Sequence, residues 1–175
     1  MNLLTNAQQL QQEADQVIQL TDVEKTFAAL GKITYVGSYV LQLLYRRDID
    51  FFVQDNECSY DKAKKTTLQL INSGLFQTVG FADWTEQKPP NNLKGFYWEL
   101  IYYLNGQKWK FDVWYTKEQN IKSIEKTHKI LKKLEEQPEA REKILQLKQQ
   151  HSDGFVYTDG YYGFKIYEQV LGKIT

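Results

Sequence analysis

The stretch that decides the fold is Val36-Gly37-Ser38, followed after nine residues by Asp48-Ile49-Asp50-Phe51. Residues 32–36 are rich in β-branched side chains and predict a strand that ends at the glycine. The apolar residues 39–45 predict one or two helical turns, and residues 48–53 predict a second strand. A glycine at such a turn lets the backbone approach a ligand closely, and the free N–H groups of a helix start suit a phosphate.

Two carboxylates lie two residues apart on the second of these strands. Alternate residues of a strand share a face, so Asp48 and Asp50 point the same way, while Ile49 and Phe51 point into the core. Adjacent carboxylates stay ionised at neutral pH only when a cation compensates them, and oxygen ligands suit Mg²⁺ or Mn²⁺. The pair therefore indicates phosphoryl or nucleotidyl transfer. The plain alternative is the solvated face of an edge strand, which often carries acids.

A third carboxylate is expected from a hairpin further along the chain. Asn105-Gly106 separates two aromatic, alternating runs, and this dipeptide favours a type I′ turn. Asp112 lies in the second arm between apolar neighbours, where an unpaired acid would be costly. Together with the first two acids it could hold two metal ions and help to receive the proton of an attacking hydroxyl. The other reading of Asp112 is a simple ion pair with Arg46 or Lys110.

The composition excludes several classes of protein. The 175 residues hold 22 Lys and Arg and 22 Asp and Glu, so the formal net charge is zero and a long nucleic-acid partner is not expected. A hydrophobic fraction of 42% excludes a disordered chain, and a single cysteine excludes an internal disulfide and a cysteine-based zinc cluster. No apolar run suits a membrane span, and the glutamine-rich start does not resemble a signal peptide, so we expect a soluble cytoplasmic protein.

Helices are predicted before and between the strands. Apolar residues at steps of three and four predict helices over residues 6–30 and 60–72. Within the first segment, Glu24 follows Thr21 by three residues, and this capping-box pattern predicts that a second helix begins there. The inner face of the 60–72 helix is expected to hold Ala63, Thr67, Leu70 and Ile71.

The order of the elements predicts the fold class. Residues 76–84 predict a strand before the hairpin, residues 86–92 with two prolines predict a loop, and residues 155–160 predict a turn. After Tyr115 the composition changes to charged, amphipathic segments that predict helices. We therefore expect an α/β (α+β) fold, with a mixed β-sheet and N-terminal helices in residues 1–115 and a C-terminal helical subdomain in residues 116–175.

The turn and the acids together resemble the signature of the nucleotidyltransferase superfamily, which has the DNA polymerase beta-like fold. The positions that match one by one are Val36, Gly37, Ser38, Asp48 and Asp50, and Asp112 matches the third acid. The form Arg47-Asp48-Ile49-Asp50 is similar to that of small antibiotic nucleotidyltransferases of the lincosamide and aminoglycoside type. The resemblance covers about residues 31–115, and it implies a mixed sheet flanked by helices.

The resemblance also implies an activity and the residues that carry it. The expected enzyme depends on Mg²⁺ (or Mn²⁺) and moves a nucleoside monophosphate, AMP from ATP, to a hydroxyl of a small-molecule acceptor. Asp48, Asp50 and Asp112 would be the catalytic and metal-binding residues. Gly37, Ser38 and Arg47 would bind the nucleoside triphosphate, since only one of Arg46 and Arg47 can face the cleft.

Two other functions fit the same motif. A protein-modifying or antitoxin-like protein of this fold would act on a partner protein. A non-catalytic module would bind a nucleotide without turning it over. Labelled AMP on a protein, on a small molecule or on neither distinguishes these three functions.

Overall fold

The computed structural model describes residues 2–86, 93–118, 121–152 and 162–174. The elements of the first part are α1 (Leu3–Thr21), α2 (Val23–Ala28), β1 (Lys32–Val36), α3 (Gly37–Val40), β2 (Asp48–Gln54) and α4 (Tyr60–Ser73). They are followed by β3 (Thr78–Asp83), β4 (Phe96–Leu104), β5 (Gln107–Thr116), α5 (Lys122–Glu136), α6 (Ala140–Ser152) and α7 (Tyr162–Leu171). The loop predicted with two prolines, except for its first residue, and the turn predicted over residues 155–160 lie outside the described residues.

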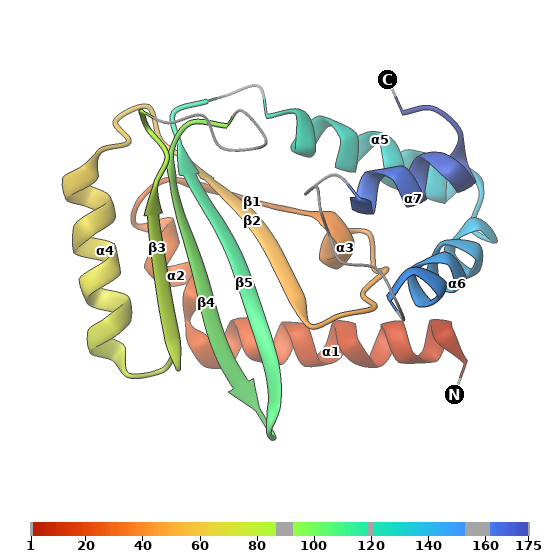
Figure 1. Cartoon of the computed structure of the whole chain (residues 1–175), viewed down its shortest axis with the longest axis horizontal. Helices are drawn as coiled ribbons and strands as arrows, with labels where there is room; N and C mark the ends of the chain where they lie inside the picture. The colour runs from red at the N-terminus through yellow and green to blue at the C-terminus, as the bar shows by residue number, and fades with distance from the viewer. Residues whose placement is uncertain (1, 87–92, 119–120, 153–161, 175) are drawn as a thin grey trace.

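The five strands form one mixed sheet in the order β1-β2-β5-β4-β3 (Figure 1). β2 and β5 run parallel and the other neighbouring strands are antiparallel. Asn105 and Gly106 join β4 to β5 with φ angles of 50° and 76°, as a type I′ turn requires. The predicted mixed sheet with flanking helices and the predicted hairpin are both confirmed.

The two faces of the sheet have different neighbours. Ile49, Phe51 and Val53 of β2 belong to the main core, which also contains buried side chains of α1, α2 and α4. Phe52 points to the other face and packs in a small cluster with Ile121, which directly precedes α5. The acids of β2 lie on this second face, because they alternate with the core residues.

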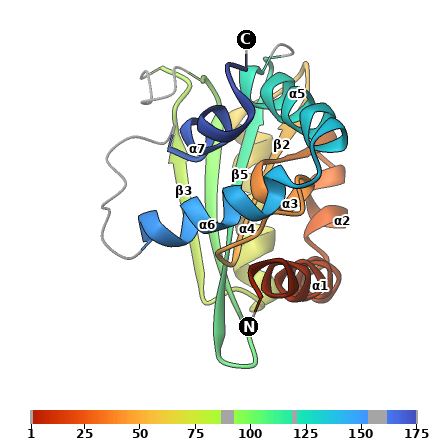
Figure 2. The same ribbon diagram turned by 90° about the vertical axis from the view of Figure 1, so that its right-hand side faces the viewer.

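The C-terminal helices have their own apolar cluster. It joins buried residues of α5, α6 and α7 to Ala7 of α1 and to Leu41 and Leu43, which follow α3. Figure 2 shows this end of the molecule, with the three helices gathered around α3. The division between residues 1–115 and 116–175 stays our proposal, and this cluster would be the contact between the two parts. Among the described residues, no helix is long and apolar enough to cross a membrane.

Two local predictions are wrong. Thr21 does not cap a helix: its hydroxyl donates to the carbonyl of Val17 at 2.7 Å, and α2 begins after Asp22, whose φ is 50°. Ile71 is 53% exposed, and the third buried residue of α4, besides Ala63 and Leu70, is Thr66. Helical periodicity indicates an apolar face, but the neighbouring elements decide which part of that face is covered.

Candidate active site

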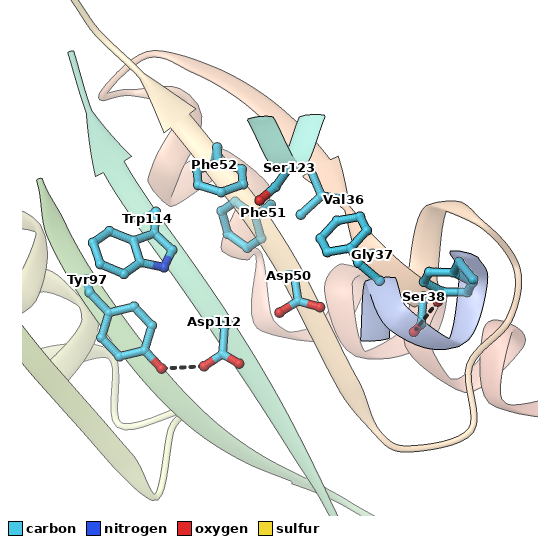
Figure 3. Close-up of a pocket in the computed structure, with 12 residues that line it drawn as sticks. Val36, Gly37, Ser38, Asp50, Phe51, Phe52, Tyr97, Asp112, Trp114 and Ser123 are labelled. Atoms are coloured by element: carbon cyan, nitrogen blue, oxygen red, sulfur yellow. Dashed lines mark hydrogen bonds between the residues drawn. The ribbon is translucent and has the colours of Figure 1, made fainter. Parts of the chain in front are cut away.

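Three carboxylates converge on the face of the sheet opposite the main core. Asp48 and Asp50 come from β2 and Asp112 comes from β5, and one oxygen of each lies within 4.8 Å of the others. The parallel register places Asp50 directly beside Asp112, and Figure 3 shows both on neighbouring strands. Asp112 is far from Asp48 and Asp50 in the chain, so the β2–β5 pairing brings the third acid to the other two.

Burial and mutual repulsion outweigh the nearby positive charges at this acid cluster. Burial raises the pKa of Asp50 well above 3.8, and the charges of Asp48 and Asp112 raise it further. Burial and then the charge of Asp112 raise the pKa of Asp48 to about 6, although Lys110 acts in the opposite direction. Groups with these pKa values would be stabilised in their ionised form by an added cation.

Lys110 is a cation held at the acid cluster. Its Nζ lies 2.5 Å from Asp112 Oδ2 and 3.4 Å from Asp48 Oδ1. Burial lowers the pKa of Lys110, but the neighbouring carboxylates outweigh burial and the pKa is raised overall. The ion pair with Asp112, one alternative from the sequence, is therefore present. It does not replace the acid cluster, because the pKa values of Asp48 and Asp50 stay raised even though the charges of Lys110, Arg46 and Lys148 act to lower them.

The acid cluster fits a hard divalent ion. Asp48 Oδ1 is buried and makes no hydrogen bond, although it lies within ion-pair distance of Lys110. The Tyr97 hydroxyl donates to Oδ1 of Asp112, while Lys110 contacts Oδ2, and this hydrogen bond orients the carboxylate (Figure 3). Carboxylate oxygens are the ligands that Mg²⁺ and Mn²⁺ prefer, so the three acids could hold such an ion beside a substrate phosphate.

Gly37 is required beside Asp50 for a steric reason. Its φ is 69°, and a Cβ at this position would lie 2.9 Å from Asp50 Oδ2. Its N–H donates to Thr127 Oγ1 of α5 at 3.4 Å. The short helix begins at Gly37 itself and has one turn, whereas the sequence placed it over residues 39–45. The Gly37-Ser38 turn therefore directly adjoins the acid cluster.

The basic group that contacts the Gly37-Ser38 turn comes from α6, a helix far from this turn in the sequence. Lys148 of α6 donates from Nζ to Ser38 Oγ at 2.8 Å, to the Leu43 carbonyl at 2.7 Å and to the Tyr167 hydroxyl at 2.9 Å. No local pattern signals this contact, because Lys148 and Ser38 are 110 residues apart. Arg47 points elsewhere, and its Nε forms an ion pair with Glu13 of α1 at 3.0 Å.

A cavity of about 370 Å³ joins Asp50 and Asp112 of the acid cluster to the Gly37-Ser38 turn. Its polar lining includes Asp50, Asp112, Gly37 and Ser38, and its aromatic lining includes Tyr97, Trp114, Phe164 and Tyr167 (Figure 3). Tyr97 and Trp114 are paired across β4 and β5, with ring centroids 5.3 Å apart. The space therefore offers carboxylates, a hydroxyl and flat aromatic surfaces to a bound molecule.

Comparisons with known proteins identify the fold. No family model and no curated protein matches the sequence. The polymerase core of TRAMP, an RNA surveillance complex, is similar over 93% of this chain and 48% of that chain, with 20% identity and a TM-score of 0.62. A cytoplasmic RNA terminal U-transferase (86% of this chain, 45% of that chain) and the Cid1 poly(U) polymerase (81% and 42%) each share 13% identity, with TM-scores of 0.56 and 0.55. The chain spans about half the length of these structures, and the likeness shows that it has the polymerase-beta-like nucleotidyltransferase fold.

Proposed function

We propose that this chain is a Mg²⁺-dependent nucleotidyltransferase that moves a nucleoside monophosphate, AMP from ATP, to a hydroxyl group. The convergence of Asp48, Asp50 and Asp112 beside the Gly37-Ser38 turn carries this proposal. The acceptor oxygen attacks the α-phosphorus, and the bond from that phosphorus to the oxygen bridging the β-phosphate breaks. Pyrophosphate leaves with the electron pair of that bond, and the hydroxyl proton passes to a base.

The three acids would divide the work. All three would hold the divalent ion, which when bound supplies positive charge to the phosphates and to the attacking oxygen. Asp112 lies on β5, which also carries Trp114 of the Tyr97–Trp114 pair. We assign Asp112 the second role of receiving the proton of the attacking hydroxyl. The Tyr97 hydroxyl donates to Asp112 and would hold that carboxylate in position.

The turn and the C-terminal helices would bind the triphosphate. Gly37 and Ser38 lie beside the acid cluster, and Lys148 brings an ammonium to Ser38 Oγ. We therefore assign the charge that faces the phosphates to Lys148. A phosphate-binding role for Arg47 would require its ion pair with Glu13 to open.

The proposed acceptor is a small molecule with a hydroxyl. The cavity of about 370 Å³ has the size of a small-ligand pocket, about 300–1,000 Å³. A link to antibiotic acceptors rests on the motif form around Arg47 alone. The terminus of an RNA is the second candidate, because the similar solved structures are the polymerase core of an RNA surveillance complex, an RNA terminal U-transferase and a poly(U) polymerase.

Incubation with α-labelled ATP and Mg²⁺ tests the function. Acceptors would include a panel of small alcohols and aminoglycosides, an RNA oligomer with a free 3′ hydroxyl, and a protein extract. Label on a small alcohol supports the main proposal, and label on RNA or on a protein identifies the acceptor class instead. Full activity of Asp48→Asn would exclude the acid-cluster mechanism. Nucleotide binding by calorimetry without transfer to any acceptor would favour the non-catalytic module.

A further inference from the structure

The outer edge of β3 is open. β3 is the last strand of the sheet, and no described strand pairs with its outer side. The Trp84 N–H donates to the Gly95 carbonyl across the β3–β4 ladder. Amides alternate between the two sides of a strand, so those of Val79, Phe81 and Asp83 point outward. Edge strands are usually protected by lysine, proline or a bulge. β3 contains neither lysine nor proline, and it is irregular at its start, where the Gln77 N–H donates to the carbonyl of Ile101, the partner of Thr78.

Large apolar side chains are exposed beside this edge. Tyr60, Leu68 and Ile71 of α4, and Leu75 directly after it, are 53%, 51%, 53% and 43% exposed. Their spacing places the three helical residues on one side of α4. The Tyr60 ring lies 6.4 Å from that of Phe81, so this side of α4 is next to β3. We call these four residues the α4 stripe.

A second copy of the chain fits both surfaces at once. Antiparallel pairing of two β3 strands creates a two-fold axis perpendicular to the sheet. Both α4 helices then lie on the same side of the joined sheet, and the two α4 stripes face each other. A lone strand from another protein would cover the edge and leave the α4 stripe exposed to water.

The charges of β3 also agree with pairing to itself. The only charged residue of the strand is Asp83, at its end. Pairing centred on Gly80 sets Ala82 opposite Thr78 of the copy and leaves Asp83 just beyond the paired segment, so the two Asp83 carboxylates do not meet. The same register sets Phe81 opposite Val79 of the copy, and the outward N–H group of each of these residues donates to the carbonyl of the other.

We propose that the chain forms a two-fold dimer through β3 and the α4 stripe, with one continuous sheet across both copies. The C-terminal helices lie at the other end of the molecule from α4 (Figure 1). The acid cluster lies on β2 and β5, away from the paired edge. Both cavities therefore stay open in the dimer, and the proposal does not depend on the proposed reaction.

Light scattering after size-exclusion chromatography of the full chain tests the dimer. The expected mass is twice the 20.7 kDa of the single chain. Ile71→Glu places a negative charge in the α4 stripe of each copy, where the dimer would bury it against apolar side chains, and should weaken the dimer at least about 100-fold. Gln69→Glu is the matched control, because it adds the same charge on an exposed position of α4 outside the α4 stripe. It should leave the dimer intact.

Amide exchange provides an independent measurement on the wild-type chain. The amides of Val79 and Phe81 should exchange more slowly as the protein concentration rises, because pairing protects them. A wild-type chain of single mass at every concentration, or unprotected Val79 and Phe81 amides in a dimer, would overturn the proposal. A dimer that tolerates Ile71→Glu, in a variant whose circular dichroism shows a folded chain, would overturn it as well.

Discussion

The acids at the two ends of β2 have opposite pKa shifts and opposite effects on the stability of the fold. At its start, Asp48 and Asp50 lie beside Asp112, and burial and mutual repulsion raise the pKa of both residues of β2 despite the nearby cations. Directly after its end, Asp55 is surrounded by hydrogen-bond donors, and it shares Lys62 with Glu57. The Tyr115 hydroxyl donates to Asp55 at 2.6 Å.

Asp55 has further donors. Lys62 Nζ lies 2.9 Å from Asp55 Oδ2, and the Glu57 N–H donates to Oδ1 at 2.9 Å. Burial acts to raise the pKa of Asp55, but the donors Tyr115 and Lys62 outweigh it and lower the pKa to about 2. A carboxylate thus stabilises the fold where donors surround it, and it weakens the fold where burial and neighbouring carboxylates outweigh the nearby cations. An arrangement that weakens the fold is typical of a functional site.

The largest expected effect is that of Asp50→Asn on transfer. Loss of a metal ligand should reduce activity by more than about 100-fold, beyond the effect typical of residues that only orient ligands. Removal of a buried, repelled charge should raise the melting temperature of the metal-free protein by about 2–6 °C. Label transfer and thermal unfolding measure the two effects, and an active or destabilised Asp50→Asn protein would contradict the comparison.

Asp55→Asn should have the opposite pattern. Activity should stay within about 3-fold of the wild type, because the residue lies at the other end of the strand. The melting temperature should fall by about 2–6 °C, since the charge-assisted hydrogen bonds are weakened. Tyr115→Phe removes one donor and should lower the melting temperature in the same direction. An unchanged melting temperature in both variants would show that Asp55 does not stabilise the fold.

Gly37→Ala tests the close contact between the turn and the acid cluster. The positive φ and the 2.9 Å approach to Asp50 should cost about 1–3 kcal/mol of stability. Gly106→Ala is the matched control, since Gly106 also has a positive φ, of 76°, but nothing lies within 4 Å of its Cβ position. We expect Gly37→Ala alone to lose transfer activity, and equal activities would argue against a role of the contact in the site.

Lys110→Met tests whether the ammonium competes with a divalent ion. The variant leaves three carboxylates without their nearest cation, so Mn²⁺ should bind about 10-fold more tightly, which corresponds to about 1.4 kcal/mol. The metal-free variant should also melt at a lower temperature than the wild type. Calorimetry with Mn²⁺ measures the affinity, and weaker binding in the variant would mean that Lys110 assists the ion.

The smallest expected effect is on the pH dependence of stability without metal. The pKa of Asp48 is about 6 in the folded chain and has the ordinary value of 3.8 in the unfolded chain. Between these pH values the folded chain therefore holds a proton that the unfolded chain has lost. Stability from this residue therefore declines as the pH rises from 3.8 to about 6. Asp55, with a pKa of about 2, contributes stability above pH 3.8 that is lost as the pH falls towards 2. Thermal unfolding of the wild type and of both variants across this pH range measures these effects. Asp48→Asn should lack the decline between pH 3.8 and 6, and Asp55→Asn should lack the loss of stability towards pH 2. Identical profiles in all three proteins would refute the assignment.

Local sequence patterns predicted much of the candidate site. Alternation placed Asp48 and Asp50 on one face of a strand, and the Asn105-Gly106 turn placed Asp112 in a neighbouring hairpin arm. These patterns are reliable because strand geometry and turn geometry depend on adjacent residues. The need for a glycine at position 37 was also predicted, as a place where the backbone approaches a ligand closely. In the structure the group that comes close to Gly37 is the carboxylate of Asp50.

Contacts between distant segments could not be predicted in this way. Lys148 reaches Ser38 only because α6 packs against the start of α1 and the residues after α3. Arg47 meets Glu13, and Ile71 stays exposed, for the same kind of reason. The sequence alone therefore determined the strands, the hairpin and which acids share a face, since periodicity is a property of adjacent residues. Tertiary structure decided which cation meets which acid and which apolar face remains uncovered, because these depend on how separate elements pack.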